Sequence, residues 1–185
     1  MIDSFLDCKL FSFIKIKEIK ILILVGILFR LLLSILYFNV TIFPDSGDYI
    51  NLSKYLLNFN LNGYDGNRSP GYPFLMFLAF GSQKLVILYQ LDLGIITSIL
   101  WYKILLKLQF NTKLSLYIAL FLESFLHVYF YETAILVESF TLFLISFLFL
   151  QLAYDYLNKK DWKVDVLMGF ILGYLVLIKP FYIFL

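Results

Sequence analysis

Two short polar segments carry the residues of this sequence that are best suited to chemistry. The first is Pro-Asp-Ser-Gly-Asp-Tyr at residues 44–49, which supplies the carboxylates of Asp45 and Asp48. The second is Arg-Ser-Pro-Gly-Tyr-Pro at residues 68–73, which begins with the guanidinium of Arg68. A carboxylate can accept a proton as a general base, and an arginine can bind a phosphate through two hydrogen bonds. Because long apolar stretches surround both segments, they indicate chemistry on a substrate presented at a membrane surface.

The local sequence around these residues also allows a purely structural interpretation. Apolar residues recur at helical spacing over residues 45–58, which predicts a helix lying on the membrane surface. Asp45 and Asp48, three positions apart, share one side of that helix. Asp45 is a candidate N-cap and Asp48 suits the helix dipole in the first turn, although neither role excludes catalysis. Arg68 is equally suited to binding a phosphate and to snorkelling into lipid headgroups.

Composition indicates the elements that must position these side chains. The chain has 185 residues, of which 62% are hydrophobic and only 15% are charged, and its mean hydropathy is +0.87. Soluble domains carry roughly 25% charged residues, so much of this chain must face lipid. Continuous apolar runs favour an all-α, polytopic membrane helical bundle over a barrel of alternating strands. A single cysteine, Cys8, excludes a disulfide framework and a cysteine-based metal cluster.

Five transmembrane helices are predicted, and residues 1–185 form a single transmembrane domain. The predicted spans are residues 20–38, 84–106, 114–131, 134–154 and 164–185. Residues 39–82 make the first external loop, in which residues 70–80 are apolar but too short to cross, so short juxtamembrane helices are expected there. Ten of the 15 Lys and Arg residues then lie on one side, which places the N-terminus in the cytoplasm and the first loop outside it.

The order of these features resembles the N-terminal part of the membrane glycosyltransferases of the C superfamily. The dolichyl-phosphate-mannose–protein mannosyltransferase and aminoarabinose-transferase group is the most similar. An apolar helix is followed by the Pro-Asp-Ser-Gly-Asp-Tyr and Arg-Ser-Pro-Gly-Tyr-Pro segments. Glu138-Ser139 resembles the family's Thr-Glu or Ser-Glu element, with Val137 in place of the hydroxyl residue. Lys179-Pro180 resembles its Arg-Pro element, with lysine for arginine.

The resemblance implies transfer of a sugar, with inversion, from a polyprenyl-phosphate donor to an extracytoplasmic protein, lipid or glycan acceptor. Asp45 matches the catalytic aspartate best and Asp48 comes second. The implied substrate- and lipid-phosphate-binding residues are Arg68, Lys179, Glu138 and Tyr49. No metal ligands are assigned, a divalent metal cofactor remains open, and we expect the lipid bilayer but no nucleic acid as a partner. The apolar run that reaches Leu185 suggests a truncated glycosyltransferase module.

Other ionisable residues fall inside the predicted spans, where each needs a partner. Arg30, Asp92 and Glu123 lie near mid-span, so we expect Arg30 to pair with Asp92 or Glu123 and to hold the bundle together, in preference to forming a proton or ion path. Glu132 is expected to reach the external water. His127 has no second His or Cys beside it, which favours a structural histidine over a metal ligand.

Two other functions remain open at this point. The abrupt end of the sequence suits a non-catalytic membrane subunit or a truncated remnant of a glycosyltransferase. The mid-span charges Arg30, Asp92 and Glu123 suit a small transporter, although the sequence lacks the paired, helix-broken repeats that many transporters use.

Overall fold

A computed structural model describes residues 17–37, 39–157 and 162–184, and within these residues the regular elements are all helices. The predicted all-α fold is therefore confirmed for this part of the chain. The helices are α2 (Lys17–Leu36), α3 (Pro44–Leu57), α4 (Gly71–Leu78), α5 (Gln83–Lys107), α6 (Thr112–Glu123), α7 (Leu126–Glu132), α8 (Glu138–Leu157), α9 (Trp162–Ile178) and the 3₁₀ helix η1 (Pro180–Phe184).

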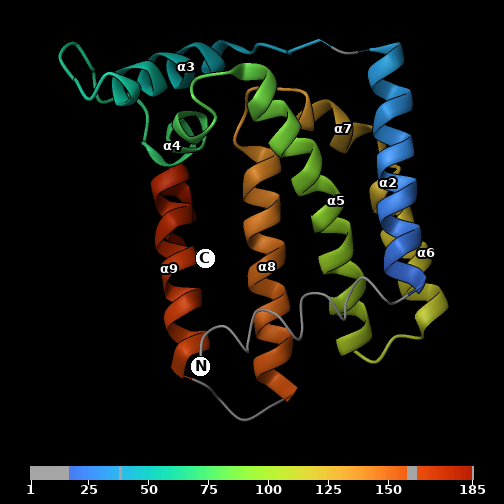
Figure 1. The fold of residues 1–185 in the computed structure, drawn as a ribbon. Coiled ribbons are helices and arrows are strands. Elements are labelled where there is room, and N and C mark those ends of the chain that lie inside the picture. The colour runs from blue at the N-terminus through green and yellow to red at the C-terminus, as the bar shows by residue number, and fades with distance from the viewer. Residues whose placement is uncertain (1–16, 38, 158–161, 185) are drawn as a thin grey trace, which may run out of the picture.

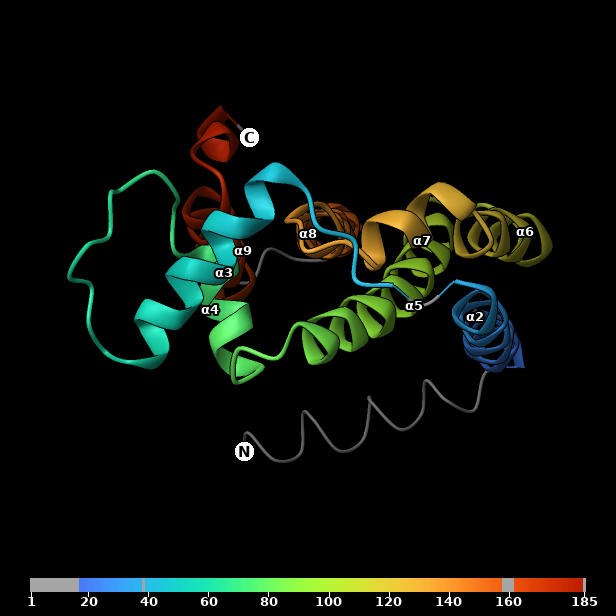
Figure 2. The same cartoon turned by 90° about the horizontal axis from the view of Figure 1, so that it is seen from above.

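The helices α2, α5, α6, α8 and α9 run side by side, and α3, α4 and α7 gather at one end of them (Figure 1). Seen from above, α3 crosses that end and α4 lies beneath it, close to α9 (Figure 2). The chain passes up α2, down α5, up α6, down α8 and up α9 (Figure 1). The end of α9 and the starts of α5 and α8 therefore reach the same end of the bundle as α3.

Two of the described helices, α2 and α5, are long and apolar enough to cross a membrane. The pair α6 and α7 makes a third when it is counted as one span that bends by 52°. This is fewer than the five predicted spans. Helix α8 contributes only a shorter apolar stretch, Glu138–Tyr154, and α9 has 17 residues.

The prediction of one continuous helix over residues 114–131 is wrong, because the chain leaves the helical path at Ser124 and Phe125. Ser124 ends α6, and its Oγ donates to the carbonyl of Leu120 at 2.9 Å. In a straight helix Glu123 and Glu132, nine positions apart, would point about 180° away from each other. The bend between α6 and α7 lets both carboxylates face the same partner on α2.

That partner is Arg30, which lies buried between α2, α6 and α7. Its Nε and Nη2 donate to Glu132 Oε2 and Oε1 at 2.9 and 2.6 Å, and its Nη1 donates to Glu123 Oε1. We call Arg30, Glu123 and Glu132 the ionic cluster. The expected pairing with Glu123 is confirmed. Glu132 does not reach water as expected, since it is fully buried, and Asp92 lies exposed on α5.

Glycines on α2 and α5 leave room for the ionic cluster. A Cβ on Gly26 would lie 2.6 Å from Glu123 Oε1. A Cβ on Gly94 of α5 would run into the Glu132 carboxylate. Only a residue without a side chain allows the backbone to approach charged groups this closely.

Below α3, a buried hydrogen-bond chain joins α4 and α5 to the segment between α7 and α8. Tyr72 donates to Gln90 Oε1 at 2.7 Å, and Gln90 Nε2 donates to the carbonyls of Glu132 and Ala134, each at 2.8 Å. Tyr72 and Gln90 are fully buried, so breaking either contact would leave a polar group without water or partner. These hydrogen bonds hold α4, α5 and the segment between α7 and α8 together below the site residues.

Candidate functional site

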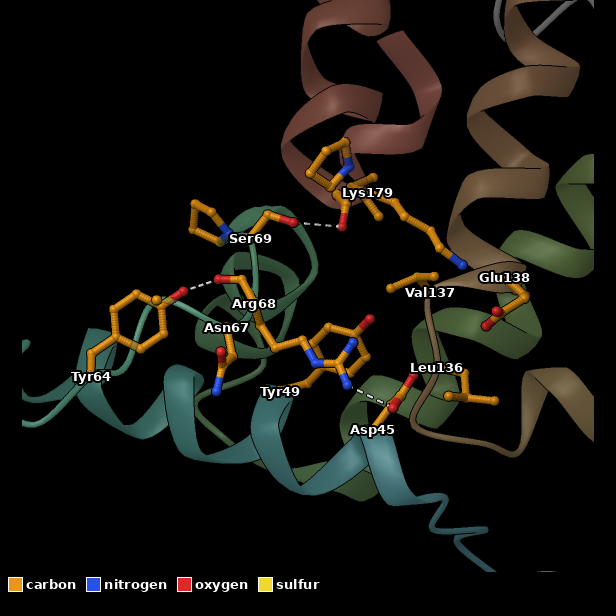
Figure 3. A pocket seen from close by; sticks show the side chains of 14 residues that line it. Asp45, Tyr49, Tyr64, Asn67, Arg68, Ser69, Leu136, Val137, Glu138 and Lys179 are labelled. Atoms are coloured by element: carbon orange, nitrogen blue, oxygen red, sulfur yellow. Dashed lines mark hydrogen bonds and ion pairs between the residues drawn. The ribbon is translucent and has the colours of Figure 1, made fainter. Parts of the chain in front are cut away.

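A cavity of about 440 Å³ opens at the end of the bundle where α3, the loop before α4, the start of α8 and the end of α9 meet (Figure 3). We call it the first cavity. It brings together five of the six predicted site residues, although they come from distant parts of the sequence: Asp45, Tyr49, Arg68, Glu138 and Lys179. The sixth, Asp48, does not line the cavity but contacts Arg68 from the next turn of α3.

Arg68 is the centre of the charged groups around the first cavity. Its Nη2 donates to Asp45 Oδ1 at 2.6 Å, and its Nε donates to Asp48 Oδ2 at 3.1 Å. Its guanidinium carbon lies 5.4 Å from the ring centroid of Tyr49, which is the distance of a cation–π contact. Hydrogen bonding to Asp48 and the charge of Asp45 raise the pKa of Arg68 above its usual value, despite partial burial that opposes the shift. Arg68 therefore stays cationic.

The ion pairs of Arg68 are accessible to a ligand. The Arg68 side chain is 30% exposed, and the side chains of Asp45 and Asp48 are 53% and 52% exposed. Exposed ion pairs contribute only ~0.2–1 kcal/mol to stability, so the fold does not depend on keeping Arg68 paired with these carboxylates. A stronger anionic partner can replace one of them without disrupting α3.

The start of α3 explains how Asp45 is presented. Phe43 is the N-cap, and Pro44 occupies the first turn, so the expectation that Asp45 is the N-cap is wrong. Ser46 takes the capping role instead, because its Oγ accepts from the Phe43 N–H at 2.9 Å and donates to the carbonyl of Ile135 at 2.8 Å. The Asp45 carboxylate is thereby left to point into the cavity toward Arg68 (Figure 3).

A short backbone bridge positions the segment before Glu138 next to the first cavity. Thr41 donates to the carbonyl of Thr133 at 3.0 Å, and Ile135 donates to the carbonyl of Thr41 at 3.1 Å. This parallel bridge joins the segment before α3 to the segment before α8. Glu138 then begins α8, and its Oε2 is buried with no hydrogen-bond partner among the residues that the structure describes. An unsatisfied buried carboxylate oxygen is unusual in a folded protein and indicates a position for a ligand group or water.

The Arg-Ser-Pro-Gly segment brings the end of α9 to the cavity. Ser69 Oγ donates to the carbonyl of Ile178 at 3.0 Å, and Tyr174 donates to the carbonyl of Gly71 at 2.8 Å. A Cβ on Gly71 would lie only 2.6 Å from the Ile178 nitrogen, so α4 can begin here only with glycine. The next residue after Ile178 is Lys179, whose side chain extends toward Glu138 (Figure 3).

Sequence reasoning missed the residues that hold the site in shape. Thr41, Ser46, Ser69 and Gly71 form contacts with segments about 90 or more positions away. The signal for three of them was their place inside the two polar motifs, where hydroxyl and glycine residues had no assigned role. Thr41 gave no signal, because a two-residue bridge leaves no periodic pattern.

Metal binding and similarity to known proteins give no further assignment. Among the described residues, no three His, Cys, Asp or Glu side chains form a group able to hold a metal ion. His127 packs against the ring of Tyr131, with the centroids 5.5 Å apart. Comparisons with protein-family models, with curated proteins and with solved structures found no match.

Proposed function

We propose that this protein is a membrane glycosyltransferase that moves a sugar from a polyprenyl-phosphate donor to an acceptor outside the cytoplasm. One observation carries the proposal: two cationic and two anionic side chains from three distant parts of the chain meet at one cavity beside apolar helices. Clefts that combine convergent charged groups with an apolar surround are the usual sites for ligands of mixed character. The order of the motifs, which resembles the C-superfamily glycosyltransferases, supports the same class.

The proposed topology has five crossings, with the N-terminus in the cytoplasm and the first cavity on the other side. The alternating directions of the long helices support it (Figure 1). Helices α8 and α9, with 20 and 17 residues, fall within the range of about 17–25 residues that spans a bilayer. The end of the bundle away from the cavity carries a cluster of lysines, in agreement with the positive-inside rule: Lys17, Lys20, Lys103, Lys107 and Lys113.

In the proposed donor complex, the lipid chain lies along the apolar helices and the phosphate binds Arg68 and Lys179. Arg68 presents a planar fork of N–H donors that matches two phosphate oxygens, and Lys179 adds a point charge. A phosphate competes with Asp45 for the Arg68 guanidinium. Donor binding therefore releases the Asp45 oxygen that now accepts from Nη2, and this oxygen is available as a base when the donor is bound.

The proposed reaction is a direct displacement at the anomeric carbon. The acceptor hydroxyl oxygen forms a bond to that carbon on the side opposite the phosphate, which inverts the configuration. The bond between the carbon and the phosphate oxygen breaks, and its electron pair leaves on the polyprenyl phosphate. The hydroxyl proton passes to Asp45. Arg68 and Lys179 stabilise the negative charge that develops on the departing phosphate. Glu138 and Tyr49 shape the cavity around the sugar.

The proposal is tested by a transfer assay on the full chain in lipid nanodiscs. Polyprenyl-phosphate-linked hexoses and pentoses are offered with a mixture of membrane lipid and glycan acceptors, and release of polyprenyl phosphate is measured. We expect Asp45→Asn to lower the rate by about 10²–10⁴-fold, because loss of a general base costs that much.

Asp92→Asn is the matched control, since Asp92 is an exposed aspartate on α5 away from the cavity. It should leave the rate unchanged. Equal rates for Asp45→Asn and the natural protein would remove Asp45 from the mechanism. If no donor gives product with the natural protein, a non-catalytic role in lipid or partner binding replaces the enzyme. Solute transport in vesicles that is abolished by Asp92→Asn would instead favour a transporter.

A further inference from the structure

A second cavity, of about 570 Å³, shares two carboxylates with the first. The two cavities share only three lining residues, namely Asp45, Leu136 and Glu138. The first cavity contains both cationic candidates, Arg68 and Lys179, and neither of them lines the second. Asp45 and Glu138 thus line both the first cavity, which contains Arg68 and Lys179, and the second cavity, which contains neither of these cations.

Half of the residues that line the second cavity carry aromatic or imidazole rings. They come from the end of α2, the segment before α3 and helix α7: Tyr37, Phe43, His127, Phe130 and Tyr131. Phe130 is 49% exposed and meets Tyr37 edge to face, with ring centroids 6.3 Å apart. Aromatic residues at a membrane surface often form a belt that simply contacts lipid headgroups. These rings differ from such a belt because they converge on a cavity that two carboxylates close at one end.

The walls of the second cavity are fixed by hydrogen bonds within the protein. Tyr129 donates to the carbonyl of Tyr37 at 3.1 Å, which holds α7 against the end of α2. The backbone bridge between Thr41 and Ala134 holds the segment before α3 against the end of α7. Walls of this kind are preorganised, so a ligand does not have to order them when it binds.

The combination of rings and carboxylates matches the chemistry of a sugar. A pyranose ring has a face of C–H groups, which packs on the electron-rich face of an aromatic ring, and an edge of hydroxyls, which donate to carboxylates. Asp45 supplies acceptor oxygens, since its side chain is 53% exposed, and Glu138 lines the same cavity.

We propose that the second cavity binds the acceptor and that the acceptor is a carbohydrate, with one hydroxyl at Asp45 and Glu138 and its ring against Phe130 and Tyr131. This assignment as an acceptor site rests on the proposed function. The donor phosphate and the acceptor sugar then approach the carboxylates from different cavities.

Sugar binding is tested without any transfer reaction. Saturation-transfer NMR on the full chain in lipid nanodiscs measures the affinity of methyl hexosides, methyl pentosides and a short Ser- and Thr-containing peptide. Binding of dodecaprenyl phosphate, which carries no sugar, is measured in parallel. We expect Phe130→Ala to weaken the best glycoside about tenfold and to leave dodecaprenyl phosphate binding unchanged. Tyr131→Leu, which keeps apolar bulk but removes the ring, should have the same effect if the fold is intact.

The control is Phe170→Ala, which removes an exposed ring from α9 at a place that lines neither cavity. It should change neither affinity. Glycoside binding that is insensitive to Phe130 and Tyr131 but lost with Arg68→Gln would place the sugar in the first cavity and overturn the inference. Binding of the peptide with no glycoside binding would also overturn it. Glycoside binding that depends on Phe130, with no binding of dodecaprenyl phosphate, would support the sugar cavity and contradict the proposed donor.

Discussion

At the scale of single residues, Arg68 connects both aspartates of α3 with the cavity. It contacts Asp45, Asp48 and the ring of Tyr49 at the same time. A guanidinium can do this because its donors lie in one plane while its face remains free to stack. An ammonium group has neither property, which makes Arg68 the most sensitive position for a conservative substitution.

We predict that Arg68→Lys weakens binding of dodecaprenyl phosphate about tenfold or more, because lysine retains the charge but loses the two-point contact and the stacking on Tyr49. Isothermal titration in nanodiscs measures the affinity. Lys54→Arg, at the last turn of α3 and outside both cavities, is a control that should leave the affinity unchanged. Equal affinities for Arg68→Lys and the natural protein would show that charge alone is recognised.

Ser46 acts at the same scale through position alone. Its hydroxyl joins the start of α3 to the carbonyl of Ile135, which sets the distance between Asp45 and Glu138. We predict that Ser46→Ala lowers the rate of transfer while the affinity for the donor phosphate changes little, because Arg68 and Lys179 keep their places. Its cost in stability is ~1–3 kcal/mol, because the variant loses the hydrogen bonds to both Phe43 N–H and the Ile135 carbonyl. Rate and affinity measured on one preparation separate these effects, and a parallel loss of both would contradict a positioning role.

At the scale of elements, the contact between α4 and α9 places the last site residue. Gly71 begins α4 directly against the backbone of Leu177 and Ile178. The short apolar helix predicted over residues 70–80 is confirmed as Gly71–Leu78, and the helix predicted over residues 45–58 is confirmed as Pro44–Leu57. Local periodicity and proline positions were sufficient for both elements.

We predict that Gly71→Ala destabilises the fold by ~1–3 kcal/mol and separates Lys179 from the cavity, because the new Cβ has backbone rather than flexible side chain in its way. Gly173→Ala on α9 is the matched control, since a Cβ there meets nothing within 4 Å. Thermal unfolding followed by circular dichroism compares the two variants. A midpoint for Gly71→Ala that equals the control value would show that the two helices separate without cost.

The break between α6 and α7 marks the limit of what periodicity predicts. Residues 114–131 are predominantly apolar, so their pattern favours one helix. Arg30, about 90 positions earlier, pairs with both Glu123 and Glu132 across the bend. Asp92 was predicted to be an equally good partner because it lies near the middle of a predicted span, but its side chain is on the exposed face of α5. Interactions between distant residues therefore decided what the local sequence left open.

At the scale of the whole molecule, the ionic cluster joins three helices inside the apolar part of the bundle. We predict that Arg30→Met destabilises the protein by ~3–5 kcal/mol, because it leaves two buried carboxylates without a counter-charge. The triple variant Arg30→Met, Glu123→Gln, Glu132→Gln should recover much of that loss, since no net charge remains buried. Thermal unfolding of the two variants measures the difference, and a triple variant no more stable than Arg30→Met would contradict this electrostatic account.

The fold of the whole molecule explains why the sequence predicted which residues form the candidate site but not how they are arranged in space. Asp45, Arg68, Glu138 and Lys179 were each identified from short motifs, and the fold brings them to one cavity. Their distances depend on Ser46, Ser69 and the bridge at Thr41, which connect segments that no motif relates. The division into two cavities that share Asp45 and Glu138 was not predicted at all, because it arises only when α7 folds back toward α2.

The close contact of Gly71 with the end of α9 has a consequence for biosynthesis. The ribosome synthesises the chain from its N-terminus, so Asp45 and Arg68 emerge long before α9. The end of α9 is the part of the protein that Ser69 and Gly71 contact. Until α9 has formed and packed against α4, Ser69 lacks the Ile178 carbonyl and Lys179 is absent. A nascent chain would thus display its carboxylates early yet complete the first cavity only when α9 has folded against α4.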